Sequence, residues 1–152
     1  MPREPDSTVD AQLEEALLRV VALAVGATIR AGDASDPVLT ATQVRTLTVL
    51  GAAPQGLTLT EVAAALAASA PSASRLCSRL HGLGLLDREH GPNNTVLLSR
   101  TEHGQDVLDR VNRARAAELR AALNSVPAAR QQQTRTALVD LGVAITDSAP
   151  LS

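Results

Sequence analysis

The sequence contains no phenylalanine, tyrosine or tryptophan and no lysine, so that all 14 basic residues are arginine, and it has one cysteine. Without Phe, Tyr or Trp the protein lacks the large aromatic side chains on which bases stack, which argues against binding of single-stranded nucleic acid. A lone cysteine excludes an internal disulfide. The core must therefore be built from leucine, valine and alanine, and any ligand pocket must be aliphatic and polar.

The sequence also shows no stretch typical of a membrane span or a signal peptide. The apolar stretch at 17–29 is interrupted by Arg19 and is too short and too rich in alanine for a bilayer span. Residues 1–10 are acidic and contain proline, unlike a signal peptide. We therefore expect a cytoplasmic protein with no membrane partner.

Catalytic and metal-binding patterns are poor. His81, His90 and His103 stand apart, and no cluster of Cys, His and carboxylate residues has metal-ligand spacing. The sequence has neither a phosphate-binding glycine loop nor a Gly-x-Ser-x-Gly elbow. These features predict no enzyme, no metal and no cofactor.

Length and charge favour one globular domain. The 152 residues are 45% hydrophobic with a net charge of −2, and we predict a single domain at 9–146 between flexible tails at 1–8 and 147–152. The charge is uneven, since residues 1–57 hold four arginines against seven acids (−3) and residues 69–100 hold four arginines against two acids (+2). The basic segment is the place to look for an anionic partner.

A helix at 69–82 carries the most informative pattern. Ser69 is a good N-cap, a proline lies in the first turn, and Gly82 and Gly84 mark the end. One side is apolar, and the other offers short hydroxyls and arginines without an acid: Ser72, Ser74, Arg75, Ser78 and Arg79. Such side chains bind phosphates and the guanine edge in the major groove. The alternative is an ordinary amphipathic helix with a basic outer face.

Cys77 lies on the apolar side of this helix, beside Leu76 and Leu80. A redox-sensing thiol there would couple oxidation to DNA release. A buried cysteine, however, usually acts as a small hydrophobic residue. The sequence favours the core role over redox sensing.

Short elements surround the helix in an informative order. Residues 58–67 predict a short capped helix, and a tight turn leads from it into the second helix, as in a helix-turn-helix. Residues 85–89 and 95–99 predict two strands joined by a turn cluster at 90–94. The predicted fold is mainly α with a small β-wing, a winged helix-turn-helix over residues 40–100.

Four blocks in this order resemble the MarR family of winged-helix transcriptional regulators. They are Leu59-Thr60-Glu61-Val62-Ala63, Ser72-Ala73-Ser74-Arg75-Leu76, Leu83-Gly84-Leu85-Leu86-Asp87-Arg88 and Thr101-Glu102-His103-Gly104. The resemblance implies a homodimer that binds a pseudo-palindromic double-stranded DNA operator and is often released by a small-molecule effector or an oxidant. It also implies that N- and C-terminal helices pair across the dimer.

The chain departs from the family pattern at two places. The family's wing carries an Asp-x-Arg pair whose arginine enters the minor groove, whereas this shorter wing has Asn93 and Asn94. We expect Arg88, His90 and the two asparagines to replace that contact in part. Arg100 stands where the family has a leucine, so its side chain must reach solvent or phosphate or alter the local packing.

Long helices flank the predicted lobe, at 9–30 and over 101–146. The first is apolar around most of its circumference and must be covered on more than one side. We predict that a partner subunit covers it, the alternative being that it crosses the core of the monomer. Residues 31–37 predict a loop, Thr40 and Thr101 predict helix N-caps, and Ser125 predicts the cap of the last helix.

Two functions from different classes remain at this point. The leading one is a sequence-specific, double-stranded DNA-binding regulator, a dimeric repressor released by a ligand or signal. The alternative is a winged-helix protein-interaction module that has lost DNA readout, motivated by the arginine-poor wing loop and the negative net charge.

Overall fold

The computed structural model describes residues 7–91 and 95–148. Its elements are α1 (Ser7–Asp33), α2 (Ala41–Gly51), α3 (Leu59–Leu66), α4 (Ala70–Gly82), β1 (Leu86–His90), β2 (Val96–Arg100), α5 (Glu102–Asn124) and α6 (Ala128–Ser148). The prediction of a mainly helical fold with a small wing is confirmed. Within the described ranges, no helix combines the length and apolar character that a bilayer crossing needs.

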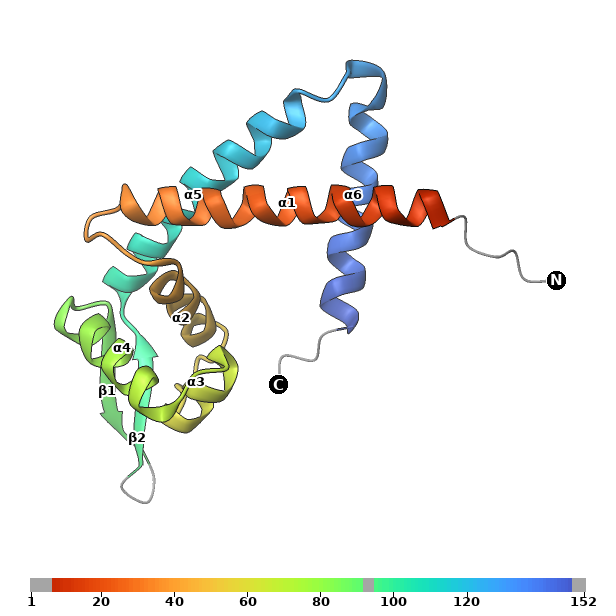
Figure 1. The fold of residues 1–152 in the computed structure, drawn as a ribbon. Coiled ribbons are helices and arrows are strands. Elements are labelled where there is room, and N and C mark those ends of the chain that lie inside the picture. The colour runs from red at the N-terminus through yellow and green to blue at the C-terminus, as the bar shows by residue number, and fades with distance from the viewer. Residues whose placement is uncertain (1–6, 92–94, 149–152) are drawn as a thin grey trace.

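The helices divide into a long base and a smaller lobe (Figure 1). In the base, α1 crosses α5, and α6 turns back from the far end of α5. The lobe gathers α2, α3, α4 and the two strands around the beginning of α5, with the hairpin at its outer tip. Since α5 belongs to both parts, it connects the lobe directly to the base.

Threonine caps fix where three helices begin. The Thr40 hydroxyl accepts from the Gln43 backbone N–H at 3.3 Å, and the Gln43 side chain accepts from the Thr40 N–H at 2.8 Å. Thr58 makes the same reciprocal box with Glu61. The Thr101 hydroxyl accepts from the Gly104 N–H at 2.9 Å. The predicted caps at Thr40 and Thr101 are therefore confirmed, and each satisfies backbone donors that a helix start leaves unpaired.

A left-handed residue makes the turn between α3 and α4. Ala67 has φ of 52°, and the N–H of Ala68 donates to the Ala63 carbonyl at 2.9 Å, which closes α3. Ser69 then caps α4. The two helices with this three-residue turn form a helix-turn-helix.

The two strands pair antiparallel, with Leu86 opposite Arg100 and His90 opposite Val96. Each strand begins one residue later than predicted. The reason lies at Leu85, whose N–H donates to the Leu80 carbonyl of α4 and whose carbonyl accepts from the Thr101 N–H. Leu85 thus completes the end of α4 and the start of α5, and it takes no part in the strand ladder.

The core of the lobe is aliphatic, as the missing aromatic residues require. It joins side chains from α2, α3, α4, the wing and the first half of α5. The members with less than 2% exposure include Leu39, Leu47, Val44, Val62, Cys77, Leu80, Leu85, Leu86, Val107 and Val111. Branched aliphatic side chains therefore provide the packing that anchors the inner face of α4.

The end of α1 corrects the predicted loop at 31–37. Residues 31–33 are helical, and Ala31 is 5% exposed. Gly32 is buried, and a Cβ atom there would lie 2.2 Å from the Leu39 carbonyl oxygen. The Leu39 N–H donates to the Gly32 carbonyl, and this hydrogen bond holds the two backbones close together. Contacts with the following segment keep these residues helical, and such contacts are invisible to local sequence pattern.

The predicted role of Ser125 is wrong. Ser125 caps the C-terminal end of α5, and its hydroxyl donates to the Ala122 carbonyl at 2.7 Å. The side chain satisfies a carbonyl left open at the end of α5, so it does not serve the start of α6.

Arg100 takes a half-buried position between three elements. Its guanidinium donates to the Leu47 carbonyl of α2 at 3.0 Å and to the side chain of Gln105, which in turn donates to Asp109. The site exists because Gly51 has no side chain, since a Cβ there would lie 2.2 Å from the guanidinium. The cation therefore lies at the C-terminal end of α2, where it is favoured by the helix dipole.

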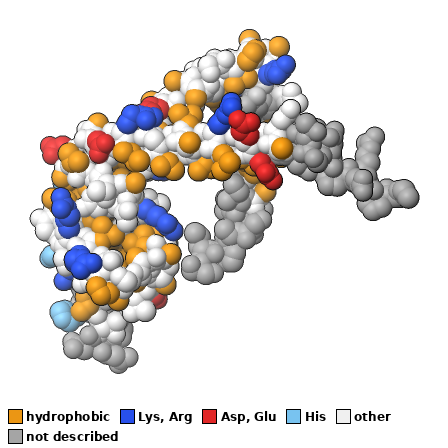
Figure 2. Space-filling view, viewed as in Figure 1, with side chains coloured by type: hydrophobic (Ala, Val, Ile, Leu, Met, Phe, Trp, Pro, Cys, Tyr) orange, Lys and Arg blue, Asp and Glu red, His pale blue; other side chains and the backbone are white. Residues whose placement is uncertain are grey.

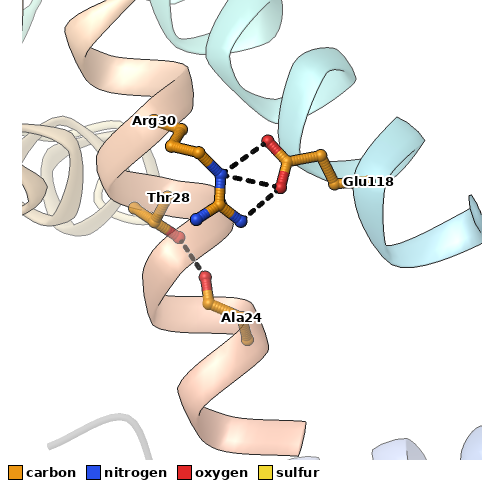
Figure 3. Close-up of polar contacts among 4 residues, drawn as sticks. All are labelled: Ala24, Thr28, Arg30 and Glu118. Atoms are coloured by element: carbon orange, nitrogen blue, oxygen red, sulfur yellow. Dashed lines mark hydrogen bonds and ion pairs between the residues drawn. The ribbon is translucent and has the colours of Figure 1, made fainter. Parts of the chain in front are cut away.

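An ion pair joins the two helices of the base (Figure 3). The Arg30 guanidinium of α1 donates to both carboxylate oxygens of Glu118 of α5, with Nε at 3.3 and 3.1 Å. These hydrogen bonds lower the pKa of Glu118 and raise that of Arg30. Because the Arg30 side chain is exposed and that of Glu118 is only half-buried, the pair contributes more to orientation than to stability.

Candidate nucleic-acid interface

The first turn of α4 is ordered by a chain of hydroxyl contacts. Ser69 accepts from the Ser72 backbone N–H at 3.4 Å, and its own hydroxyl donates to the Ser72 Oγ at 2.9 Å. The Arg75 guanidinium also donates to the Ser72 Oγ, at 3.4 Å. This local network holds Ser72 and Arg75 together at the N-terminal end of the helix, the end that recognition helices present to bases.

The outer face of α4 is basic and exposed. Ala73, Cys77 and Leu80 are buried against the lobe, so the opposite side of the helix faces solvent. Of the predicted contact residues, four are exposed and one is half-buried: Ser72, Arg75, Ser78 and Arg79 are exposed, and Ser74 is half-buried. The helix contains no acidic residue. Its free face can thus approach a polyanion without like-charge repulsion from its own side chains.

Ser74 is less exposed than predicted because the wing folds over that side of α4. It lines a small pocket of about 220 Å³ between the helix and the hairpin. The other lining residues are Leu59, Cys77, Arg88, Val96 and Leu98. Ser74 therefore lies at the margin of the exposed face, closer to the wing than the helical pattern alone indicates.

The Cys77 thiol faces the interior. The residue is 1% exposed, and burial raises the pKa of the thiol, although the nearby Arg88 charge opposes that shift. A raised pKa leaves little of the reactive thiolate near neutral pH. The position fits the predicted core role.

The wing contributes charged residues of both signs. Arg88 and His90 are exposed on β1, as are Asp87 and Glu89, while Asn93 and Asn94 lie outside the described residues. The Arg88 guanidinium does not extend toward the wing tip, since it donates to the Ser78 hydroxyl of α4 at 2.8 Å. The sequence pattern missed this pairing, although strand alternation places Arg88 on the same side as the buried Leu86.

Comparison with protein families gives a match over the lobe. The MarR family profile matches residues 39–94, which run from the start of α2 through β1 into the wing. Residues 39–94 are therefore similar to the MarR family. Among curated proteins, no sequence matches the chain.

Solved MarR structures share the fold of almost the whole chain. A MarR family protein from Bacillus stearothermophilus superposes with a TM-score of 0.77 at 19% identity, covering 94% of this chain and 99% of that one. The multiple antibiotic-resistance repressor MarR from Listeria monocytogenes gives 0.76 at 14% identity, covering 95% and 99%. A MarR-family transcriptional regulator from a Rhodococcus species gives 0.62 at 21% identity, covering 87% and 94%. The MarR fold thus extends beyond the lobe to the helices of the base.

Outside the lobe, the chain exposes many large apolar side chains. They lie on α1 and α6: Leu13, Leu17, Leu18, Val20, Val21, Val25, Ile29, Leu138, Val139, Leu141 and Val143, each at least 43% exposed. Figure 2 shows hydrophobic side chains in a row along α1. An exposed apolar surface of this extent is typical of an interaction site.

Proposed function

We propose that this protein is a dimeric MarR-family regulator that binds double-stranded DNA with α4 in the major groove. The observation that carries the proposal is the acid-free outer face of α4, with Arg75 and Arg79 exposed on a helix whose other side is anchored in the core. Arginine can donate two hydrogen bonds to the O6 and N7 atoms of guanine, and serine can bond phosphate. The structural similarity to the multiple antibiotic-resistance repressor MarR from Listeria monocytogenes supports the same class.

The dimer is part of the proposal. The apolar residues of α1 and α6 need a cover, and a second copy of the chain supplies the same surface in return. Two α4 helices roughly 34–36 Å apart would then contact successive major grooves on one side of the duplex. A pseudo-palindromic operator follows from that symmetry.

Release by a small ligand completes the proposed repressor. We infer an effector site between the base and the lobe, because α5 connects the two parts. The described surface also has a groove of about 610 Å³ within the lobe, between α2 and α3, lined by Arg45, Thr48, Val49, Ala52, Ala53, Gln55, Leu57, Glu61 and Ala65. These side chains are aliphatic and polar, as expected for a chain without aromatic residues.

The first test is selection of random double-stranded DNA on the purified protein at moderate salt. We expect an enriched palindrome with half-sites one helical turn apart. Replacing Arg75 or Arg79 by alanine should cost about 1–3 kcal/mol in binding and relax the preference at one base pair of each half-site, if that arginine reads guanine. Unchanged affinity and preference in both variants would remove α4 as the recognition helix.

A protein-interaction module is the second candidate. Two acidic side chains, Asp87 and Glu89, are exposed on the wing strand, and the net charge is −2. This candidate would be favoured over the DNA-binding regulator if the selection enriched no duplex and if the retention of DNA by the protein did not change with salt concentration.

A further inference from the structure

Arg88 and Ser78 form a pair that joins the wing to the recognition helix. The guanidinium Nη2 donates to the Ser78 Oγ at 2.8 Å, and both residues are exposed. Strand alternation places Arg88 on the side of β1 that faces α4, with the buried Leu86. Asp87 and Glu89 therefore lie on the opposite face of the strand, away from the pair.

The hydrogen bond fixes how Ser78 can interact with a ligand. A serine hydroxyl has one O–H donor and two acceptor lone pairs. One lone pair accepts from Arg88, and in the described parts of the chain the Ser78 hydroxyl makes no other hydrogen bond. By contrast, the hydroxyls of Thr46 and Thr48 donate to backbone carbonyls of their own helix. The Ser78 O–H thus remains available to donate outward, and the adjacent cation strengthens it as a donor.

Arg88 also keeps donors available. A guanidinium carries five N–H donors, and the contact with Ser78 uses one of them. Within the described residues Arg88 has no carboxylate partner, since the ion pairs found there are Arg19–Glu15 and Arg30–Glu118. The pair therefore presents hydrogen-bond donors and a positive charge side by side, and no carboxylate of the described residues forms an ion pair with that charge.

We propose that Ser78 and Arg88 together bind one phosphate of the DNA backbone beside the recognition helix. The inference rests on the proposed function, because it assumes that α4 contacts duplex DNA. A phosphodiester has a single negative charge and two acceptor oxygens, which match one hydroxyl donor and one guanidinium. Arg88 then positions the helix along the backbone, while Arg75 and Arg79 carry the base readout.

The test maps phosphates one at a time on the DNA selected with the wild-type protein. Each duplex carries one neutral methylphosphonate per half-site, and affinities are measured for the wild type and for Arg88→Met. We expect one phosphate whose neutralisation weakens the wild type about tenfold and leaves Arg88→Met unaffected. The slope of log K against log salt should become shallower by about 0.9 per half-site in Arg88→Met. Arg113→Met, which removes an exposed arginine from α5, should keep both the wild-type slope and the wild-type phosphate pattern.

The hydroxyl is tested through a double-mutant cycle. Ser78→Ala should weaken binding in the Arg88 background and have little further effect in Arg88→Met, with selected sequences unchanged in every variant. A wild-type phosphate pattern in Arg88→Met, or a changed base preference in Ser78→Ala, would overturn the phosphate site while leaving the proposed function in place. Failure of the wild type to retain any duplex would instead overturn the proposed function, and this inference with it.

Discussion

Glu61 fixes the first turn of α3 through the residue that caps it. Its carboxylate accepts from the Thr58 backbone N–H and from the Thr58 hydroxyl, both at 2.7 Å. These two hydrogen bonds, the backbone one first, lower the pKa of Glu61 below its ordinary value of 4.5. The ionised form is therefore preferred in the folded protein, which links the start of the helix-turn-helix to pH.

Replacing Glu61 with glutamine should remove that dependence. Because the folded pKa is depressed, the carboxylate stabilises the fold above the unfolded value of 4.5, and this contribution is lost as pH falls through the folded pKa. Glu61→Gln keeps a neutral acceptor at the cap but lacks the carboxylate charge. The variant should therefore be less stable than wild type at pH 7 and should approach the stability of wild type near pH 3. Urea unfolding midpoints across that range measure the difference. Glu14→Gln on exposed α1 is the control, and a Glu61→Gln deficit that stays constant with pH would contradict the prediction.

Arg100 shows the limit of reasoning residue by residue. The sequence predicted that a cation in place of leucine must reach solvent, phosphate or altered packing, and the structure selects altered packing. Its acceptor at Leu47 is 53 positions away along the chain, and the necessary space is provided by Gly51. Neither partner follows from local pattern, since both depend on how β2 packs against α2.

At the scale of elements, the junction of α4, β1 and α5 depends on a close approach of two backbones. A Cβ atom at Gly104 would lie 2.3 Å from the Leu85 carbonyl oxygen and 3.0 Å from Cγ of Arg100. The Leu85 carbonyl cannot move away freely because it accepts a hydrogen bond from the Thr101 N–H. The glycine in the first turn of α5 therefore lets that helix pack directly on the segment that ends α4.

Two alanine substitutions compare a crowded glycine with an open one. Gly104→Ala should lower the free energy of unfolding by about 1–3 kcal/mol, because the added methyl overpacks against backbone. Gly82→Ala in α4 has no atom within 4 Å of the new Cβ and should leave stability unchanged or raise it by up to about 1 kcal/mol. Urea denaturation of both variants measures the contrast, and equal effects would show that the approach at Gly104 can relax.

The elements were predictable where local chemistry defines them. Thr40, Ser69 and Thr101 are confirmed as caps because a hydroxyl and the following N–H groups lie within one turn. The strands were predicted one residue early because Leu85 hydrogen-bonds to the end of α4 and the start of α5. Ser74 was placed wholly on the exposed face because the folding of the wing back onto α4 does not follow from helical pattern. The Ser78–Arg88 pair was missed for the same reason. The direct contacts with DNA stay predictions.

For the whole molecule, the decisive feature is the uncovered base. Packing of α1 on α5 buries Ala27 and Ala31 and leaves the larger apolar residues of α1 exposed. The described apolar residues of α6 are exposed as well. Hydrophobic surface on both helices supports the proposal that a second chain completes the base, as the sequence predicted for α1.

A charge placed on this surface should separate the subunits. Val21→Glu would bury two unpaired carboxylates in each proposed dimer. The free-energy cost of that burial, about 3–5 kcal/mol, would weaken association at least a hundredfold. Light scattering should then report a dimer for wild type and a monomer for Val21→Glu. Val96→Glu changes another exposed valine, on the distant wing, and as the control it should remain dimeric. Identical masses for all three proteins would exclude α1 from the interface.

The aliphatic core also makes the chain nearly transparent in the near ultraviolet, since it contains no ring and no disulfide that absorbs there. Ultraviolet absorbance of a complex with DNA, or with an aromatic effector, would report almost entirely on the bound partner. One tryptophan introduced at the wing would be the sole indole emitter, so its fluorescence would follow the lobe without background from the rest of the protein. The absence of Phe, Tyr and Trp thus gives any introduced optical label a dark background.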